Sequence, residues 1–241
     1  MSEGLEGPIL LHLPGVPEII TMSWVVMAAI IILCAIATMK VKIIPGKLQN
    51  ILEWGFEKIS ALSEGTIGKE GIKYTPLFLT IFLFIFFSNL LGLLPGFKSP
   101  TSSINTTVAL ALVVFFSTHY LGIKKKGLWG YIKHFMGPPY WLAPLFFPLH
   151  IISELARPLS LSIRLFGNIM AKEILLGMLG FLFIVFLDVP GVIGKIMLLV
   201  PLILRPAIIL LGTLVSFIQA LVFTSLSIIY IAGATATEEH N

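Results

Sequence analysis

The chain has 241 residues, of which 57% are hydrophobic and 12% charged, against about 25% charged in an ordinary soluble domain. With a mean hydropathy of +1.00, this composition excludes a soluble globular protein and predicts an all-α integral membrane protein, with residues 1–241 as a single transmembrane domain. The net charge of +4 does not indicate nucleic-acid binding, because ten of the sixteen basic residues lie in two loops beside apolar segments, where membrane orientation explains them.

Three uncharged stretches are close to the length of about 20 residues that a membrane-spanning helix needs. They are residues 19–39, 77–97 and 104–123. Residues 1–18 hold three glutamates and no lysine or arginine, and the first span has no basic region before it, so we expect an outer N-terminal segment rather than a cleaved signal peptide.

The loops that join these spans differ in charge. Ten lysines follow the first and third spans, whereas Lys98 is the only basic residue after the second. The positive-inside rule therefore predicts an outer N-terminus and a cytoplasmic C-terminus in a bacterial inner membrane, with an organelle membrane as the alternative. Within the 40–73 loop, apolar residues recur at helical spacing, which predicts an amphipathic helix at the inner surface. These residues are Leu48, Ile51, Leu52, Phe56, Ile59 and Leu62.

Two longer apolar stretches, residues 149–187 and 192–235, are separated by a turn pattern at 188–191. As continuous helices they reach about 58 and 66 Å, about twice the thickness of a hydrocarbon core. They either break at Pro158, Pro201 and Pro206 or lie strongly tilted. We favour a hairpin of two tilted helices. The alternative, a separate short membrane span over 192–204, would leave Lys195 and Arg205 awkwardly placed and would make a sixth span. The prediction is thus about five membrane-embedded helices plus one amphipathic helix.

Arg164 lies in the middle of the first long stretch, where a charge costs roughly 2.5 kcal/mol or more. Its guanidinium cannot lose its proton, and no acidic residue stands three or four positions away to neutralise it. On a helical projection five further polar residues fall within about 80° of Arg164, whereas Glu173 falls near 180°. The five are His150, Glu154, Arg157, Asn168 and Lys172. The structural alternative pairs Glu154 with Arg157 and lets Lys172 extend beside Glu173.

Four segments, in the same order, closely resemble subunit a of F-type ATP synthase, the stator part of its membrane motor. They are residues 88–95 (SNLLGLLP), 100–107 (PTSSINTT), 158–173 (PLSLSIRLFGNIMAKE) and 218–223 (IQALVF). The resemblance extends over most of the chain from about residue 75. It implies that Arg164 is the family's essential arginine and that Gln219 is its glutamine partner.

The resemblance also implies a function and a set of partners. An ion, expected to be a proton, passes through two offset half-channels against a rotating ring of c subunits, and the gradient drives ATP synthesis. The expected partners are the c-ring, the b subunits of the peripheral stalk, other ATP synthase subunits and the lipid bilayer. ATP chemistry belongs to partner subunits, so we expect no catalysis by this chain alone and no cofactor.

The predicted topology assigns residues to the half-channels. Glu173 lies outward of Arg164 by about 13 Å along the helix, and Glu154 lies inward by a similar distance. Glu173 therefore belongs to the outer half-channel, and Glu154, with His150 and Ser153, to the inner one. Asn89 and Asn168 either line water or pack as buried amides.

The chain departs from some relatives at Lys172, where they have a small residue, at Gly212, where they have histidine, and at Gly92, where they have an acid. The outer path must then use other groups around Glu173. Lys172 either influences that carboxylate or extends toward the membrane surface.

Two other classes of protein remain as alternatives. A secondary ion transporter usually shows related halves, and the sequence has no internal repeat. A channel is distinguished by ion conductance of the purified chain. No nucleophile motif, P-loop or histidine cluster supports a membrane enzyme, and the lone Cys34 allows neither an intramolecular disulfide nor a thiolate metal site. The choice between H⁺ and Na⁺ stays open at this stage.

Overall fold

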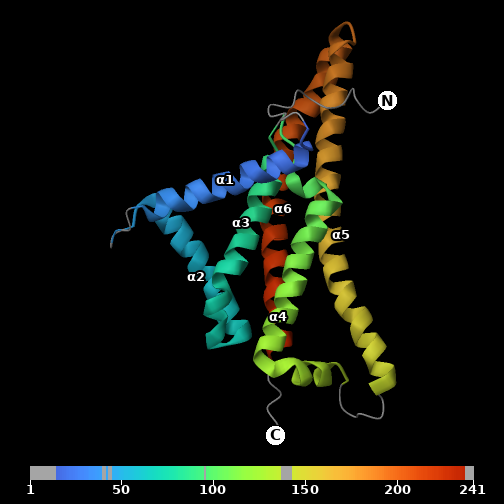
Figure 1. The fold of residues 1–241 in the computed structure, drawn as a ribbon. Helices are drawn as coiled ribbons and strands as arrows, with labels where there is room; N and C mark the ends of the chain where they lie inside the picture. Colours follow the sequence, from blue (N-terminus) through green and yellow to red (C-terminus); the bar gives the residue numbers. More distant parts are fainter. Residues whose placement is uncertain (1–14, 40–41, 43–44, 95, 137–142, 237–241) are drawn as a thin grey trace.

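The computed structural model describes residues 15–39, 42, 45–94, 96–136 and 143–236, so residues 1–14 of the predicted outer segment lie outside the described part. Across these residues the chain forms six α-helices and two short 3₁₀ helices, without a strand (Figure 1). Five helical stretches are long and apolar enough to cross a membrane, and α2 is the sixth helix. The predicted all-α membrane fold, with five such helices and an amphipathic one, is confirmed.

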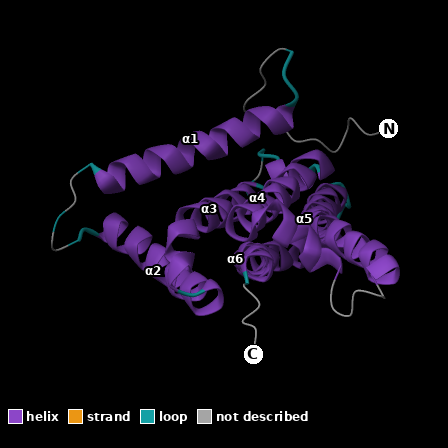
Figure 2. Cartoon of the chain, turned by 60° about the horizontal axis from the view of Figure 1, so that its bottom comes forward, coloured by secondary structure: helices purple, strands orange, loops and turns teal. Residues whose placement is uncertain are grey.

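The first helix, α1 (Glu18–Thr38), matches the first predicted span closely. It lies crosswise to α6 and touches the rest of the chain mainly near α3 and α2 (Figures 1 and 2). The amphipathic helix predicted in the next loop is α2 (Lys47–Ile67), which ends at Gly68, where a φ of 89° stops the helix. On α2 the side chains of Gln49 and Ser63 are buried, whereas Ile51 and Trp54 are exposed.

The next two helices form the centre of the molecule. A short 3₁₀ helix, η1 (Lys69–Tyr74), leads into α3 (Thr75–Leu91), which ends six residues before the predicted end of the second span. The chain then turns through Gly92 and Gly96 into a second 3₁₀ helix, η2 (Pro100–Ser102). The following helix, α4 (Ile104–Met136), continues past the predicted span and changes direction at Gly127, whose φ is 75° (Figure 1).

The two long helices form a hairpin. They are α5 (Ala143–Leu187) and α6 (Val192–Thr235), joined by the predicted turn, in which Gly191 has a φ of 92°. Both helices continue through their internal prolines, so Pro158, Pro201 and Pro206 do not break them. The helices meet at the turn and diverge away from it, and the turn projects beyond α3 and α4 (Figure 1).

The hydrophobic core lies where α3, α4, α5 and α6 meet. Each helix contributes apolar side chains that are almost fully buried. The cluster comprises Ile81 and Ile85 of α3, Ala111 and Val114 of α4, Leu161, Leu165 and Ile169 of α5, and Ala220 and Phe223 of α6. This core fixes the middle third of α5, which carries Arg164, against α6 near Gln219. Toward the turn most of the large apolar side chains of the hairpin are exposed, as expected of a surface within a membrane.

Candidate functional site

Arg164 lies on α5 between two residues of the hydrophobic core, Leu161 and Leu165, and its own side chain is exposed. Within the described part of the chain, no ion pair or side-chain hydrogen bond reaches its guanidinium. A permanent charge on an apolar membrane helix needs an opposite charge or water. The geometry therefore leaves Arg164 open to water or to a carboxylate that does not belong to the described part of the chain.

A hydrogen bond joins α5 to α6 one helical turn from Arg164. Asn168 Nδ2 donates to Gln219 Oε1 at 2.6 Å, and Gln219 is 4% exposed. Gln219 thus faces the polar side of α5, although its side-chain partner is Asn168 and not Arg164. This bond joins α5 to α6 beside Arg164, so it helps to hold the helix surface that carries the guanidinium in place.

Near the start of α5 the Glu154 carboxylate pairs with Arg157 one turn later, the pairing that the structural alternative predicts. The Arg157 guanidinium also lies 5.1 Å from the centre of the Tyr230 ring, a cation–π distance. Together with Thr118, these three residues line a cavity of about 10 Å³, which is room for about one water molecule. His150 and Ser153 lie exposed nearby on α5.

Toward the turn of the hairpin, Glu173 contacts a segment far away in the sequence. The backbone N–H of Ser99 donates to Glu173 Oε1 at 3.2 Å. The Ser99 hydroxyl donates to the carbonyl of Ser88 at 2.8 Å, and the Thr101 hydroxyl donates to Asn89 Oδ1 at 2.7 Å. Apart from Glu173, the residues of this network are buried; they are Ser88, Asn89, Ser99 and Thr101. Asn89 and Glu173 could be identified from the sequence, whereas Ser99 and Thr101 could not, because their only signal was their place beside or within the 100–107 motif.

Two polar atoms of this network have no hydrogen-bond partner among the described residues. They are Ser88 Oγ and Asn89 Nδ2, both fully enclosed. Buried polar atoms in native proteins nearly always have a protein or water partner. The pair therefore fits a site that takes up water close to Glu173.

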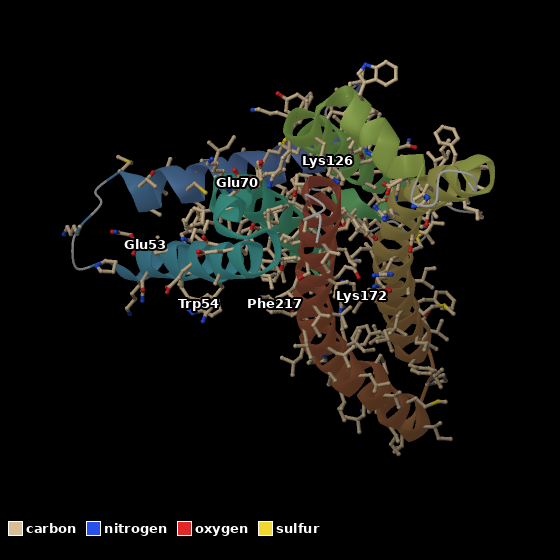
Figure 3. The ribbon with its side chains drawn as sticks, turned by 90° about the horizontal axis from the view of Figure 1, so that it is seen from below. Glu53, Trp54, Glu70, Lys126, Lys172 and Phe217 are labelled. Carbon is tan, nitrogen blue, oxygen red and sulfur yellow. The ribbon has the colours of Figure 1, made fainter. Side chains whose placement is uncertain are left out.

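Lys172, next to Glu173 in the sequence, is directed toward α6 and lies between the two long helices (Figure 3). Its ammonium donates to the Ser216 hydroxyl at 2.9 Å, and that hydroxyl donates to the Gly212 carbonyl at 2.7 Å. A Cβ atom at Gly212 would lie 3.7 Å from Lys172 Cδ and 2.8 Å from a methyl of Leu93. A side chain at 212 would thus displace the Leu93 methyl and contact the lysine stem, and no ion pair joins Lys172 to Glu173 in the described structure.

The close approach of Gly92 to Ser99 gives a test of this packing. A Cβ at position 92 would lie 2.7 Å from the Ser99 Cβ and 3.5 Å from Glu173 Oε1. Gly92→Ala is therefore expected to push the Ser99 segment away from Glu173 and to destabilise the chain by about 1–3 kcal/mol, as overpacking does. The measurement is the thermal unfolding temperature of the purified protein in detergent.

Gly177→Ala is the matched control, because open space surrounds position 177 on α5 and helical alanine is favoured over glycine by up to about 1 kcal/mol. We expect Gly177→Ala to unfold at or slightly above the temperature of the unmodified protein. Equal unfolding temperatures for Gly92→Ala and Gly177→Ala would contradict the close packing of Gly92 against Ser99.

Comparisons with known proteins agree over nearly the whole chain. A family model described as ATP synthase A chain matches residues 20–232. A protein of Syntrophotalea carbinolica named ATP synthase subunit a 2 is 45% identical, with 89% of this chain and 84% of that protein aligned. ATP synthase subunit a of Geobacter sulfurreducens is 45% identical over 90% of this chain and 87% of its own length. The protein of that name from Campylobacter curvus is 45% identical over 88% of both chains.

Proposed function

The chain belongs to the ATP synthase A chain family, and from this premise we propose that it is the membrane stator subunit that carries ions past the c-ring of an F-type ATP synthase. The observation that carries the proposal is the guanidinium of Arg164, exposed on a membrane helix and without a partner in the described part of the chain. A carboxylate in mid-membrane on each c subunit supplies the missing charge. The chain performs no ATP chemistry itself, and its other partners are the b subunits and the remaining ATP synthase subunits.

The role of Arg164 follows from electrostatics. An opposite charge within about 4–6 Å favours the ionised form of a carboxylate. When a c-subunit carboxylate reaches Arg164 it therefore gives up its ion, and the fixed positive charge prevents the ion from passing directly between the half-channels. Lysine is a poor substitute because a buried ammonium can lose its proton. The bond between Asn168 and Gln219 supports this arrangement by holding α5 against α6 beside Arg164.

The outer half-channel ends at Glu173. Its carboxylate is reached through the segment that holds Ser99 and Thr101, where the unpartnered polar atoms of Ser88 and Asn89 favour bound water. Protons move readily along chains of water, hydroxyls and carboxyls. We propose that an ion entering from outside passes this network to Glu173 and then to a c subunit, while Lys172 stays bound to Ser216.

The inner half-channel lies at the opposite end of the site, around Glu154. Its carboxylate, paired with Arg157, lines a cavity large enough for one water molecule, whose polar lining also includes Thr118 and Tyr230. His150 lies one turn further toward the start of α5. We propose that ions leaving the ring pass this group to the cytoplasm of a bacterial cell, in whose inner membrane the chain lies with its N-terminus outside and its C-terminus inside.

The orientation of α1 supports the tilt of the hairpin. The 21 residues of α1 extend about 31 Å, which matches a hydrocarbon core of about 30 Å when the helix stands near the membrane normal. Because α6 lies crosswise to α1 (Figures 1 and 2), an upright α1 places α6 oblique to the normal. An oblique course keeps a helix of about 66 Å within the membrane, as its 44 residues require.

Sidedness of access tests the two half-channels. In a Cys34→Ser background, Glu173→Cys is expected to react with a membrane-impermeant thiol reagent added outside, and Glu154→Cys with the same reagent added inside. Labelling is measured on whole cells and on inverted vesicles. Asp188→Cys, at the exposed turn of the hairpin, is the reference for outer access. Reaction of both positions from the opposite sides would reverse the assignment of the half-channels.

A further inference from the structure

A large recess lies between α5 and α6 on the side of the site toward the hairpin turn. Its volume is about 580 Å³, and most of its lining is apolar. Leu179 and Phe183 line it from α5, and Pro201, Ile209 and Thr213 are among the residues that line it from α6. An apolar recess of this size within a membrane does not stay empty, because lipid chains are present at high concentration and water gains few hydrogen bonds there.

One charged side chain lines this recess, that of Arg205. It is exposed, and no residue in the described part of the chain pairs with it. Arg205 stands on nearly the same face of α6 as Gln219, about 21 Å further along the helix toward the turn. In the proposed function Arg164 meets a mid-membrane carboxylate, which puts the neighbouring Gln219 near that depth. On a helix inclined roughly 60° from the normal, about 21 Å along the axis is about 10 Å of depth, so the long arginine side chain brings its guanidinium within reach of the outer headgroup layer.

We propose that this recess, together with Arg205, binds an anionic phospholipid, with an acyl chain between α5 and α6 and the phosphate paired with the guanidinium. The charge selects the headgroup, since arginine and phosphate form strong bidentate pairs. The apolar lining selects a lipid over free phosphate, which has nothing to place in the recess. The same lining argues against an aqueous ion path, because apolar cavities remain dry.

The bound lipid has a structural consequence for the neighbouring site. The recess ends at Thr213, one residue from Gly212, beside which the stem of Lys172 passes. An acyl chain in the recess therefore lies between α5 and α6 near the hairpin turn, and it closes the space between these two helices on the side of the turn. The lipid site depends on the proposed function only for its depth, and lipid binding is measured without reference to ATP synthesis.

The test uses the intact ATP synthase complex, purified in detergent and titrated with lipid, with bound lipid counted by native mass spectrometry. The probes are phosphatidylglycerol, phosphatidylcholine with the same acyl chains, and inorganic phosphate. Removing the charge in Arg205→Gln is expected to weaken phosphatidylglycerol binding by about tenfold at one site per complex, as loss of a charge-assisted pair predicts. Arg205→Lys is expected to retain most of this binding.

Lys195→Gln is the matched control, because Lys195 is an exposed cation of the same helix that does not line the recess. It is expected to bind phosphatidylglycerol as the unmodified complex does. A second variant, Ile209→Trp, fills the recess while keeping the arginine, and it is expected to lose the same lipid. It tests the proposal independently where Arg205→Gln lowers assembly.

Three outcomes would overturn the lipid site. Equal loss in Lys195→Gln and Arg205→Gln would mean a general attraction of anionic lipid to a basic surface. Equal binding of phosphatidylcholine, or of inorganic phosphate, would mean that the phosphate and the acyl chain are not recognised together. Unchanged binding in both Arg205→Gln and Ile209→Trp would show that the recess holds no lipid. None of these variants alters Arg164, Glu173 or Glu154, so each of these outcomes would overturn the lipid site and leave the proposed function standing.

Discussion

Arg164→Ala is expected to abolish ATP synthesis while leaving the complex assembled. The side chain is exposed and has no partner in the described structure, so its removal breaks no internal contact that the fold needs. In the proposed function, by contrast, the c-subunit carboxylates lose the opposite charge that makes them release their ion. Breaking such a pair in a poorly solvated place costs about 3–5 kcal/mol, so synthesis falls at least about a hundredfold. The measurement is respiration-driven ATP synthesis in inverted membrane vesicles, with the amount of assembled complex determined by immunoblot.

Two further variants sharpen this test. Arg164→Lys keeps a positive charge in a group that can lose its proton, and we expect it to synthesise little or no ATP. Lys195→Ala removes a cation from the exposed outer part of α6, and we expect normal synthesis. Normal coupled synthesis by Arg164→Ala would refute the assignment of the essential arginine.

Glu173→Gln is expected to lower ATP synthesis by at least about tenfold, because an amide cannot take up and release a proton as a carboxyl group does. The amide oxygen can still accept the hydrogen bond from the Ser99 backbone, so the fold around position 173 is expected to remain. Synthesis and ATP-driven proton pumping are measured in the same vesicles, and both are expected to fall together.

Asp188→Asn is the control for Glu173→Gln, since it removes an acid from the exposed turn of the same hairpin without touching the polar network. Its synthesis is expected to equal that of the unmodified complex. Unchanged synthesis by Glu173→Gln would show that the outer path bypasses this carboxylate, for example through Asn89 and water alone.

The long elements of the fold could be predicted from the sequence because hydropathy and turn residues agree there. The pattern at 188–191 fixed both ends of the hairpin turn, and the structure places the end of α5 at Leu187 and the start of α6 at Val192. The end of α3 could not be predicted in this way. Residues 92–97 carry no charge and contain Leu93, Leu94 and Phe97, so a hydropathy window extends the span across them, whereas the chain leaves the helix at Gly92.

Much of the candidate site depends on contacts that no helical projection contains. The projection placed Glu173 opposite Arg164 on α5, but its partner, the Ser99 backbone, lies 74 residues earlier in the sequence. The partner of Lys172 also lies on another helix. The sequence suggested that its ammonium extends beside Glu173, whereas in the structure the ammonium donates to Ser216 on α6. The pairing of Glu154 with Arg157 was predictable, because residues three apart on one helix are neighbours in any fold.

One unbroken helix, α5, carries Glu154, Arg164 and Glu173. The two glutamates are 19 positions apart, so about 28 Å of helix separates them, and if that helix runs roughly 60° from the normal, about 25 Å of this separation is sideways and only about 14 Å is depth. On the proposed half-channels, an ion delivered beside Glu173 has to be carried around the circumference of the ring before it can leave beside Glu154. The proposed function then makes the slope of this single helix the determinant of the sense of rotation: a hairpin inclined the opposite way would turn the ring backwards under the same gradient.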